Sequence, residues 1–174
     1  VLSPVYGAFD TSASDAQRQI IAIPMKRSDD NRYTVDYEAF ETAITMHDVN
    51  LFIHCNPHNP VGHVWTENEM ARLFSICERH KVLIISDEIH QDLITGSTPF
   101  TSALTVASGA YADNIIAMSS LSKSFNMASL HHAEVIIPNE KLRGQFNFYK
   151  VHVYHTDSDV IAETAITVAY THPE

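Results

Sequence analysis

The 174 residues predict one α/β domain with a mostly parallel sheet and helices on both of its faces. Three observations support this fold class. Apolar runs of strand length alternate with amphipathic stretches of helical spacing, which is typical of parallel sheets. The run Lys81–Ser86 (KVLIIS) is continuously apolar, as in strands that are buried on both faces. The chain has no internal repeat and no long linker, so we expect a single domain over residues 1–174.

The first elements follow from the spacing of apolar residues. The start, VLSPVYGAF, is typical of an apolar strand end that runs into a turn, and residues 19–25 (QIIAIPM) predict a short strand. Residues 36–46 predict a helix, with Thr34 as its candidate cap. The apolar residues of this helix recur at helical spacing: Tyr37, Phe40, Ala43 and Ile44.

The middle of the chain predicts a strand, a turn and a second helix. Residues 49–55 (VNLFIHC) form the strand, which ends in the proline-rich turn NPHNPVG. Thr66 and Glu69 form a capping box, which marks a helix start. The buried face of this helix is predicted to consist of Met70, Leu73, Phe74 and Cys77.

The rest of the chain predicts two more strands and two helices. Turn-forming residues predict a loop over residues 95–113. Residues 114–119 (NIIAMS) and 133–137 (AEVII) predict strands, because both are short apolar runs rich in β-branched residues. Residues 139–174 predict two helices, although the aromatic and β-branched residues of NFYKVHVYH favour the first one less.

The composition narrows the classes of partner that this protein can bind and indicates its cellular compartment. Lysines and arginines total 11 against 21 aspartates and glutamates, so the formal charge of −10 argues against a nucleic-acid partner. No apolar run reaches the length of a membrane helix and no basic region opens the chain, so we expect no membrane association. Cys55 and Cys77 form no CxxC pair, so we expect buried thiols rather than a disulfide. These features together predict a cytoplasmic protein.

Polar motifs fall where the predicted strands end. Asn59 lies in NPHNPVG, Asp87 directly follows KVLIIS, and Lys123 lies in SSLSKSFN after the strand at 114–119. Ligands of open α/β sheets bind outside the carboxyl ends of the strands. The sequence therefore predicts a ligand site that includes these three residues.

Each of the three residues has an ordinary interpretation beside a chemical one. A lysine is normally a solvated surface charge, but a lysine of lowered pKa is a nucleophile that condenses with carbonyls, and the serines around Lys123 suit an anion. Asp87 is either a cap or turn residue, or the acceptor for a protonated pyridine nitrogen. Asn59 is either a turn residue or a fixed hydrogen-bond donor.

The combination of these motifs resembles fold-type I pyridoxal-phosphate enzymes, the class I and II aminotransferase superfamily. The matching motifs, in the same order and spacing, are NPHNPVG, SDEIH and SLSKSFN. Within that superfamily the segments NPHNPVGHVWT, SDEIHQDL and SKSFN are most similar to those of the MalY/PatB-type cystathionine β-lyase group. The resemblance extends over nearly the whole chain, including PFTS and VIIPNEKLR. It implies that the chain is the major part of the large, cofactor-binding domain of such an enzyme.

The resemblance implies a role for each matching residue. Lys123 would bind pyridoxal 5'-phosphate as a Schiff base and then act as the proton-shuttling base. Asp87 would pair with the pyridine nitrogen and Asn59 with the phenolic oxygen, near which His90 would also lie. Ser120 and Ser122 would hold the phosphate, and the aromatic ring of Tyr6 would stack on the cofactor ring.

The implied reaction is α,β-elimination from a cysteine S-conjugate such as cystathionine, which yields a thiol, pyruvate and ammonia. Two alternatives stay open: an aminotransferase that uses the same residues, and an inactive fragment or binding module that keeps the ancestral core. The resemblance also implies a small amino-acid substrate and a homodimer.

The chain departs from the family pattern in two respects. The family's upstream phosphate-binding loop, its downstream small domain and the arginine that grips the substrate carboxylate are expected to lie outside these residues. After SKSFN, the family's glycine-containing turn is replaced by residues that end in His131 and His132. The 11 histidines suggest two candidate sets of metal ligands: His54, His58 and His63, or His131 and His132. Neither set has the compact spacing of zinc ligands, so we expect no metal site.

Overall fold

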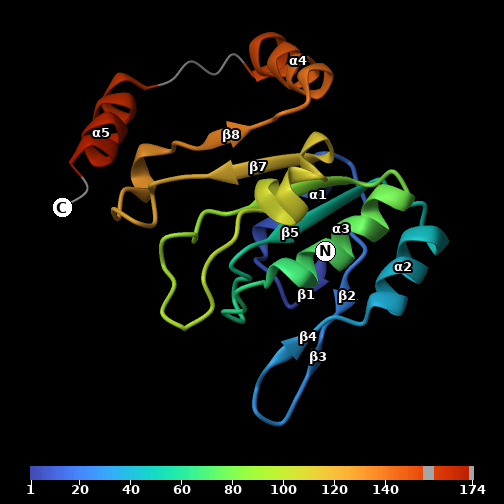
Figure 1. Ribbon diagram of the computed structural model, residues 1–174. Coiled ribbons are helices and arrows are strands. Elements are labelled where there is room, and N and C mark those ends of the chain that lie inside the picture. Colours follow the sequence, from blue (N-terminus) through green and yellow to red (C-terminus); the bar gives the residue numbers. More distant parts are fainter. Residues whose placement is uncertain (155–158, 173–174) are drawn as a thin grey trace.

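The computed structural model describes residues 1–154 and 159–172, and its centre is a four-stranded sheet of order β5-β6-β7-β8 (Figure 1). The strands are β5 (Leu51–Cys55), β6 (Leu83–Asp87), β7 (Ile115–Ser119) and β8 (Glu134–Ile136). The first two pairings are parallel, and β8 runs antiparallel to β7. The predicted α/β class with a mostly parallel sheet is therefore confirmed, and so are the predicted positions of these four strands.

Helix α3 (Glu67–Arg79) connects β5 to β6 and covers one face of the sheet. The predicted capping box is present: Thr66 Oγ1 accepts a hydrogen bond from Glu69 N (3.3 Å), and Glu69 Oε2 accepts one from Thr66 N (2.9 Å). The side chains of the sheet on this face are fully buried: Phe52, His54, Ile84, Ser86, Ile115 and Ala117. The alternate residues Ile53, Leu83 and Ile85 are only partly buried, because successive strand residues point to opposite faces.

The N-terminal residues form two small sheets at the side of the central one. Strand β1 (Leu2–Ser3) pairs in parallel with β2 (Ile23–Pro24). Of the strand predicted at residues 19–25, only β2 forms. Strands β3 (Lys26–Arg27) and β4 (Tyr33–Thr34) form a hairpin. Between β1 and β2 lies α1 (Ala8–Asp15), which the sequence analysis missed. No residue of α1 is buried, so it carries no apolar periodicity from which it could be predicted.

Helix α2 (Tyr37–Met46) forms as predicted, but its predicted cap is wrong. Asp36 is the N-cap, and its side chain accepts a hydrogen bond of 3.0 Å from Ala39 N. Thr34 lies two residues too early, in β4, so its hydroxyl belongs to the hairpin rather than to the first turn of the helix. The helix buries Phe40 and Ile44 in the core.

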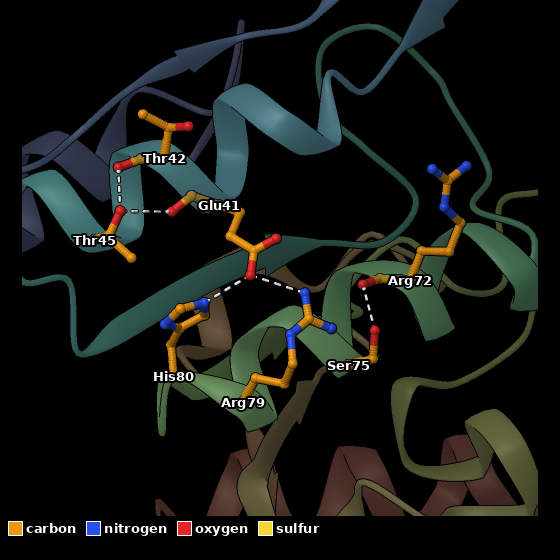
Figure 2. A network of polar contacts seen from close by, with 7 residues as sticks. All are labelled: Glu41, Thr42, Thr45, Arg72, Ser75, Arg79 and His80. Atoms are coloured by element: carbon orange, nitrogen blue, oxygen red, sulfur yellow. Dashed lines mark hydrogen bonds and ion pairs between the residues drawn. The ribbon is translucent and has the colours of Figure 1, made fainter.

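A polar network joins α2 to the C-terminal end of α3 (Figure 2). Glu41 Oε1 accepts hydrogen bonds from Arg79 Nη2 (2.9 Å) and from His80 Nε2 (2.8 Å). These hydrogen bonds lower the pKa of Glu41 below its ordinary value, the one from His80 first and the one from Arg79 second. Because the Glu41 side chain is 38% exposed and therefore screened by solvent, we assign this network a role in orienting the two helices rather than a large share of the stability.

The long connection between β6 and β7 contains more structure than the loop predicted at 95–113. Two 3₁₀ segments form there, Ala103–Gly109 and Ala112–Asn114. The first buries Ala103 and Val106 and is kinked, with positive φ values at Ala107 (51°) and Ser108 (57°). Short 3₁₀ segments carry too few residues to show a periodic pattern, which is why the sequence indicated a loop.

The C-terminal part forms the two predicted helices, which lie beyond the edge strand β8 in Figure 1. Helix α4 (Glu140–Tyr149) continues into a π-helical turn (Lys150–Tyr154), and α5 (Val160–Thr171) follows. Together with Ile116 and Val135, α4 lines a pocket of about 720 Å³ on the sheet face opposite α3. α4 reaches this face only through the lining of that pocket and buries no residue of its own. No helix in the described ranges is long and apolar enough to cross a membrane.

Both cysteines are buried free thiols, as predicted. Burial raises the pKa of Cys55 to about 11 and that of Cys77 to about 12. Both thiols are therefore protonated at neutral pH and behave as small apolar side chains.

Candidate active site

The candidate site is built on three adjacent strand ends. Cys55 at the end of β5 pairs in register with Asp87 at the end of β6, and Asp87 pairs with Met118 near the end of β7. Neighbouring strands lie roughly 4.8 Å apart, so the segments that follow these strands start side by side. The sheet therefore brings Asp87 and the turns that carry Asn59 and Lys123 to one edge.

The NPHNPVG turn is held rigidly against this edge. Asn56 is fully buried; its main-chain N–H donates to Asp87 O (2.8 Å) and its side-chain amide donates to Thr101 O (2.9 Å). Within the turn, Gly62 N donates to His58 O (2.8 Å), with Gly62 in the left-handed region at φ 71°. These bonds fix the position of Asn59, whose neighbours on both sides cannot move freely.

Asn59 and His90 line one pocket of about 870 Å³. Its other walls come from the β3–β4 hairpin (residues 31–34) and from the loop at residues 95–98. Among the described residues, the remaining predicted site residues lie outside this lining: Tyr6, Asp87, Ser120, Ser122 and Lys123. The structure thus brings Asn59 and His90 into one cavity. Asp87 ends β6, and Ser120, Ser122 and Lys123 follow the end of β7, outside the lining of that cavity.

Asp87 is a partly buried carboxyl group at the end of β6. Burial raises its pKa above the ordinary value, while the hydrogen bond from Ile89 N (3.2 Å) and the nearby His90 act in the opposite direction. That bond is made by Oδ1, and within the described residues no hydrogen bond is recorded for Oδ2. One carboxyl oxygen is therefore available to a ligand.

Lys123 is an exposed residue of the turn that follows β7. Two contacts tie this turn to the segment after β6: Gln91 Nε2 donates to Ser119 Oγ (2.9 Å) and Ser124 Oγ donates to Asp92 Oδ2 (2.6 Å). These contacts hold the lysine-bearing turn beside the segment that begins with Asp87.

The two predicted phosphate ligands have different surroundings. Ser120 is buried, and its hydroxyl donates to His132 O (2.7 Å) and accepts from Ser122 N (3.1 Å). The side chain of Ser122 is partly exposed, and no hydrogen bond is recorded for its hydroxyl among the described residues. Ser122 can therefore donate to an anion directly, whereas Ser120 first has to rotate its hydroxyl away from His132.

Tyr6 follows β1 on the side of the NPHNPVG turn. His58 Nε2 lies 3.0 Å from Pro4 O, which ties this segment to the turn. The Tyr6 side chain is 52% exposed and contacts Phe9 edge-to-face, with the ring centroids 5.8 Å apart. A ring of that exposure is free to stack on a planar ligand.

Three of the histidines flagged in the sequence pack around one tryptophan. His54, His58 and His63 surround Trp65, with ring centroids 5.3, 5.6 and 4.5 Å from the indole. Within residues 1–154 and 159–172, no group of three or more histidine, cysteine, aspartate or glutamate side chains is placed to hold a metal ion. The cluster packs as aromatic core.

A family model of class I and II aminotransferases matches residues 1–173. The chain belongs to this family. Its motifs NPHNPVG, SDEIH and SLSKSFN are the three segments that the structure brings to the strand ends, so the resemblance inferred from the sequence is confirmed.

Relatives of this aminotransferase-family chain include lyases and aminotransferases. It is similar to cystathionine β-lyase PatB of Bacillus subtilis, with 37% identity over 129 residues that make up 72% of this chain and 32% of PatB. Its fold matches the PLP-bound putative aminotransferase from Clostridium difficile 630 with a TM-score of 0.92 and 34% identity over 99% of this chain and 44% of that chain. It also matches the PLP-bound C-S lyase from Staphylococcus hominis with a TM-score of 0.90 and 29% identity over 99% of this chain and 42% of that chain.

The chain spans about a third of PatB's length and less than half of either solved structure. The similarity therefore shows the family and the fold of this portion. The activity of the whole protein is a matter for proposal.

The structure adds supporting residues that the sequence analysis of this family member missed. Glu88 is 3% exposed, and its Oε1 accepts hydrogen bonds from Ser86 Oγ (2.9 Å) and Ala103 N (2.8 Å). Burial raises the pKa of Glu88, and these bonds oppose that effect. Glu88 fastens the 101–103 segment to β6, one residue from Asp87. The only signal in the sequence is a second carboxylate in SDEIH, whose burial the spacing alone does not reveal.

Proposed function

We propose that this chain binds pyridoxal 5'-phosphate and forms the cofactor-binding part of a carbon–sulfur lyase of the cystathionine β-lyase type. The observation that carries the proposal is the convergence of Lys123, Asp87 and Asn59 on adjacent strand ends. The two PLP-bound solved structures that share this fold support it.

The residues at this edge fit the cofactor group by group. Lys123 supplies an exposed amine for its carbonyl, and the free oxygen of the Asp87 carboxyl suits its ring nitrogen. Asn59, in a fixed turn, offers an amide to the phenolic oxygen, with His90 on the same pocket wall. The Ser122 hydroxyl, and Ser120 after rotation, offer hydrogen bonds to the phosphate, and the Tyr6 ring offers a stacking surface.

Each group would then act on the reaction from its place in the fold. When bound, pyridoxal phosphate supplies an electron sink for charge that develops at the α-carbon of an amino acid. The partly buried Asp87 would hold a proton at the ring nitrogen, because a carboxylate beside a cation stabilises it. The Lys123 amine would take the proton from the substrate α-carbon. Elimination at the β-carbon then releases a thiol, and water converts the remainder to pyruvate and ammonia.

Two readouts test the proposal. Pyridoxal phosphate added to the purified chain should produce a visible absorbance band that is absent in Lys123→Ala, since the amine is the attachment point. Cystathionine should then yield pyruvate without any keto-acid acceptor. A colourless parent chain would overturn the claim that these residues suffice to bind the cofactor.

An aminotransferase is the second candidate, favoured by the similarity to the putative aminotransferase from Clostridium difficile. It would use the same Lys123, Asp87 and Asn59. Amino-group transfer that depends on a keto acid, without pyruvate release from cystathionine, would decide for it. Cofactor binding without either activity would decide for a binding module or inactive fragment instead.

The remaining attributes of the enzyme are part of the proposal. The substrate would be a small amino acid and the assembled enzyme a homodimer, which size-exclusion chromatography with light scattering would test. We place the protein in the cytoplasm, because its two buried thiols are unpaired, as expected in a reducing compartment.

A further inference from the structure

A series of polar contacts runs from α5 to the turn that follows β7. The Tyr170 hydroxyl in α5 lies 3.2 Å from Glu134 Oε1 in β8, and His132 Nε2 lies 3.2 Å from the same oxygen. The main-chain carbonyl of His132 accepts a 2.7 Å hydrogen bond from Ser120 Oγ, which itself accepts one of 3.1 Å from Ser122 N. Ser122 directly precedes Lys123 in the chain.

We propose that His132 is a positioning residue for the turn that carries Lys123. This inference rests on the proposed role of Lys123 as the cofactor attachment point. His132 acts through its backbone carbonyl, which accepts the hydrogen bond of Ser120, while its imidazole keeps that carbonyl in place through its 3.2 Å contact with Glu134. No part of His132 needs to touch the cofactor for this role.

The backbone geometry explains why the imidazole matters. His131 is in the left-handed region at φ 47°, so the chain reverses sharply just before His132. β8 begins only at Glu134, so the peptide that presents the His132 carbonyl lies outside the regular strand. The contact between His132 and Glu134 is the side-chain link that joins this irregular peptide to the sheet.

The side chains of His132 and Glu134 are largely enclosed, so water cannot take the place of either one without a loss of stability. The side chains of His132 and Glu134 are only 25% and 26% exposed. His132 Nε2 and Glu134 Oε2 are buried and make no hydrogen bond within the described residues, so the 3.2 Å approach of Nε2 to Glu134 Oε1 is the polar contact available to that nitrogen. Removing the imidazole would remove the polar group nearest to the Glu134 carboxylate in this enclosed place, which disfavours the folded arrangement of the loop.

A second carboxylate, that of Asp92, also contacts the turn that carries Lys123. Asp92 accepts a hydrogen bond from Ser124, next to Lys123, and lies close enough to Tyr170 to help raise the pKa of that phenol, after burial and Glu134. The lysine-bearing turn is thus held from two sides, by Asp92 at Ser124 and by His132 at Ser120.

The adjacent histidine provides a matched control. His131 is exposed, and no side-chain hydrogen bond is recorded for it within the described residues. Asparagine tolerates the left-handed region, so His131→Asn and His132→Asn can be compared directly. In His132→Gln the amide nitrogen can take the place of Nε2 and should restore the contact with Glu134.

The test is amide hydrogen exchange at Ser122 in the cofactor-free chain, followed by the affinity of each variant for pyridoxal phosphate from its absorbance. We expect exchange about tenfold faster in His132→Asn, because one hydrogen-bonded brace is lost, and unchanged in His131→Asn and His132→Gln. The apparent dissociation constant for the cofactor should rise several-fold in His132→Asn and return to the parent value in His132→Gln.

Equal exchange at Ser122 in His132→Asn and His131→Asn would overturn the inference, and so would faster exchange spread evenly over the whole chain. Should His132→Asn not fold, Glu134→Gln removes the carboxylate from the same contact with little change of shape and decides by the same comparison. Failure of the parent chain to bind the cofactor would refute the proposed function of Lys123, while the exchange data would still decide the role of His132.

Discussion

Acid should destabilise this protein through His54, a histidine buried in the core. His54 is 1% exposed, and neither ring nitrogen has a hydrogen-bond partner among the described residues. Its ring packs against Phe52, Trp65 and Phe74, with centroids 5.7, 5.3 and 5.4 Å away. Burial first, and the nearby His58 and His63 second, lower the pKa of His54 from 6.5 to about 3.

The sign and size of the effect follow from proton linkage. The unfolded chain takes up a proton at His54 below pH 6.5, whereas the folded chain keeps the ring neutral until about pH 3. Stability is therefore complete above pH 6.5 and is lost progressively as the pH falls toward 3. At ~1.4 kcal/mol for each pH unit, the loss between pH 6.5 and pH 5 is ~2 kcal/mol.

The assay is urea unfolding at pH 7 and pH 5, followed by the fluorescence of Trp65, the single tryptophan. In His54→Phe the loss between the two pH values should shrink by ~2 kcal/mol. It should not vanish, because burial also lowers the pKa of His58. The exposed His47→Phe is the matched control and should behave as the parent. An equal loss of stability in the parent and in His54→Phe would refute the reasoning.

Two further predictions concern the second helix of the core and the thiols. Thr66→Ala removes the capping box with Glu69 at the start of α3 and should lower the free energy of unfolding by ~1 kcal/mol, measured by urea titration at pH 7; an unchanged midpoint would contradict the assigned cap. Cys55 and Cys77, whose pKa values burial raises to about 11 and about 12, should resist a thiol reagent in the folded chain and react fully in urea; rapid reaction of the native protein would contradict their burial.

The sequence predicted best those elements whose side chains face the core. The strands at Leu51–Cys55, Leu83–Asp87 and Ile115–Ser119 are apolar because they are enclosed, and α3 shows its buried face directly. α1 buries no residue, so nothing in its composition separates it from a loop. The choice of Asp36 over Thr34 as a cap depends on where the hairpin ends, which spacing does not fix.

For the candidate site, the motifs indicated which residues matter but not what holds them. Lys123, Asp87 and Asn59 follow apolar runs, so their place at the strand ends could be read from the chain. The braces beside them, Glu88 at Ala103 and His132 at Ser120, join residues separated by 15 and 12 positions. Neither contact produces a periodic pattern in the sequence.

The sequence alone thus determined the α/β class, the family and the chemical groups gathered at one edge of the sheet. Those properties are encoded in local runs of apolar residues and in short motifs. Only the tertiary structure decided the antiparallel direction of β8, the burial of Glu88 and His54, and the contact of His132 with the lysine-bearing turn. These depend on which distant segments pack together, and strand direction, burial and hydrogen-bond partners become defined only when the chain closes on itself.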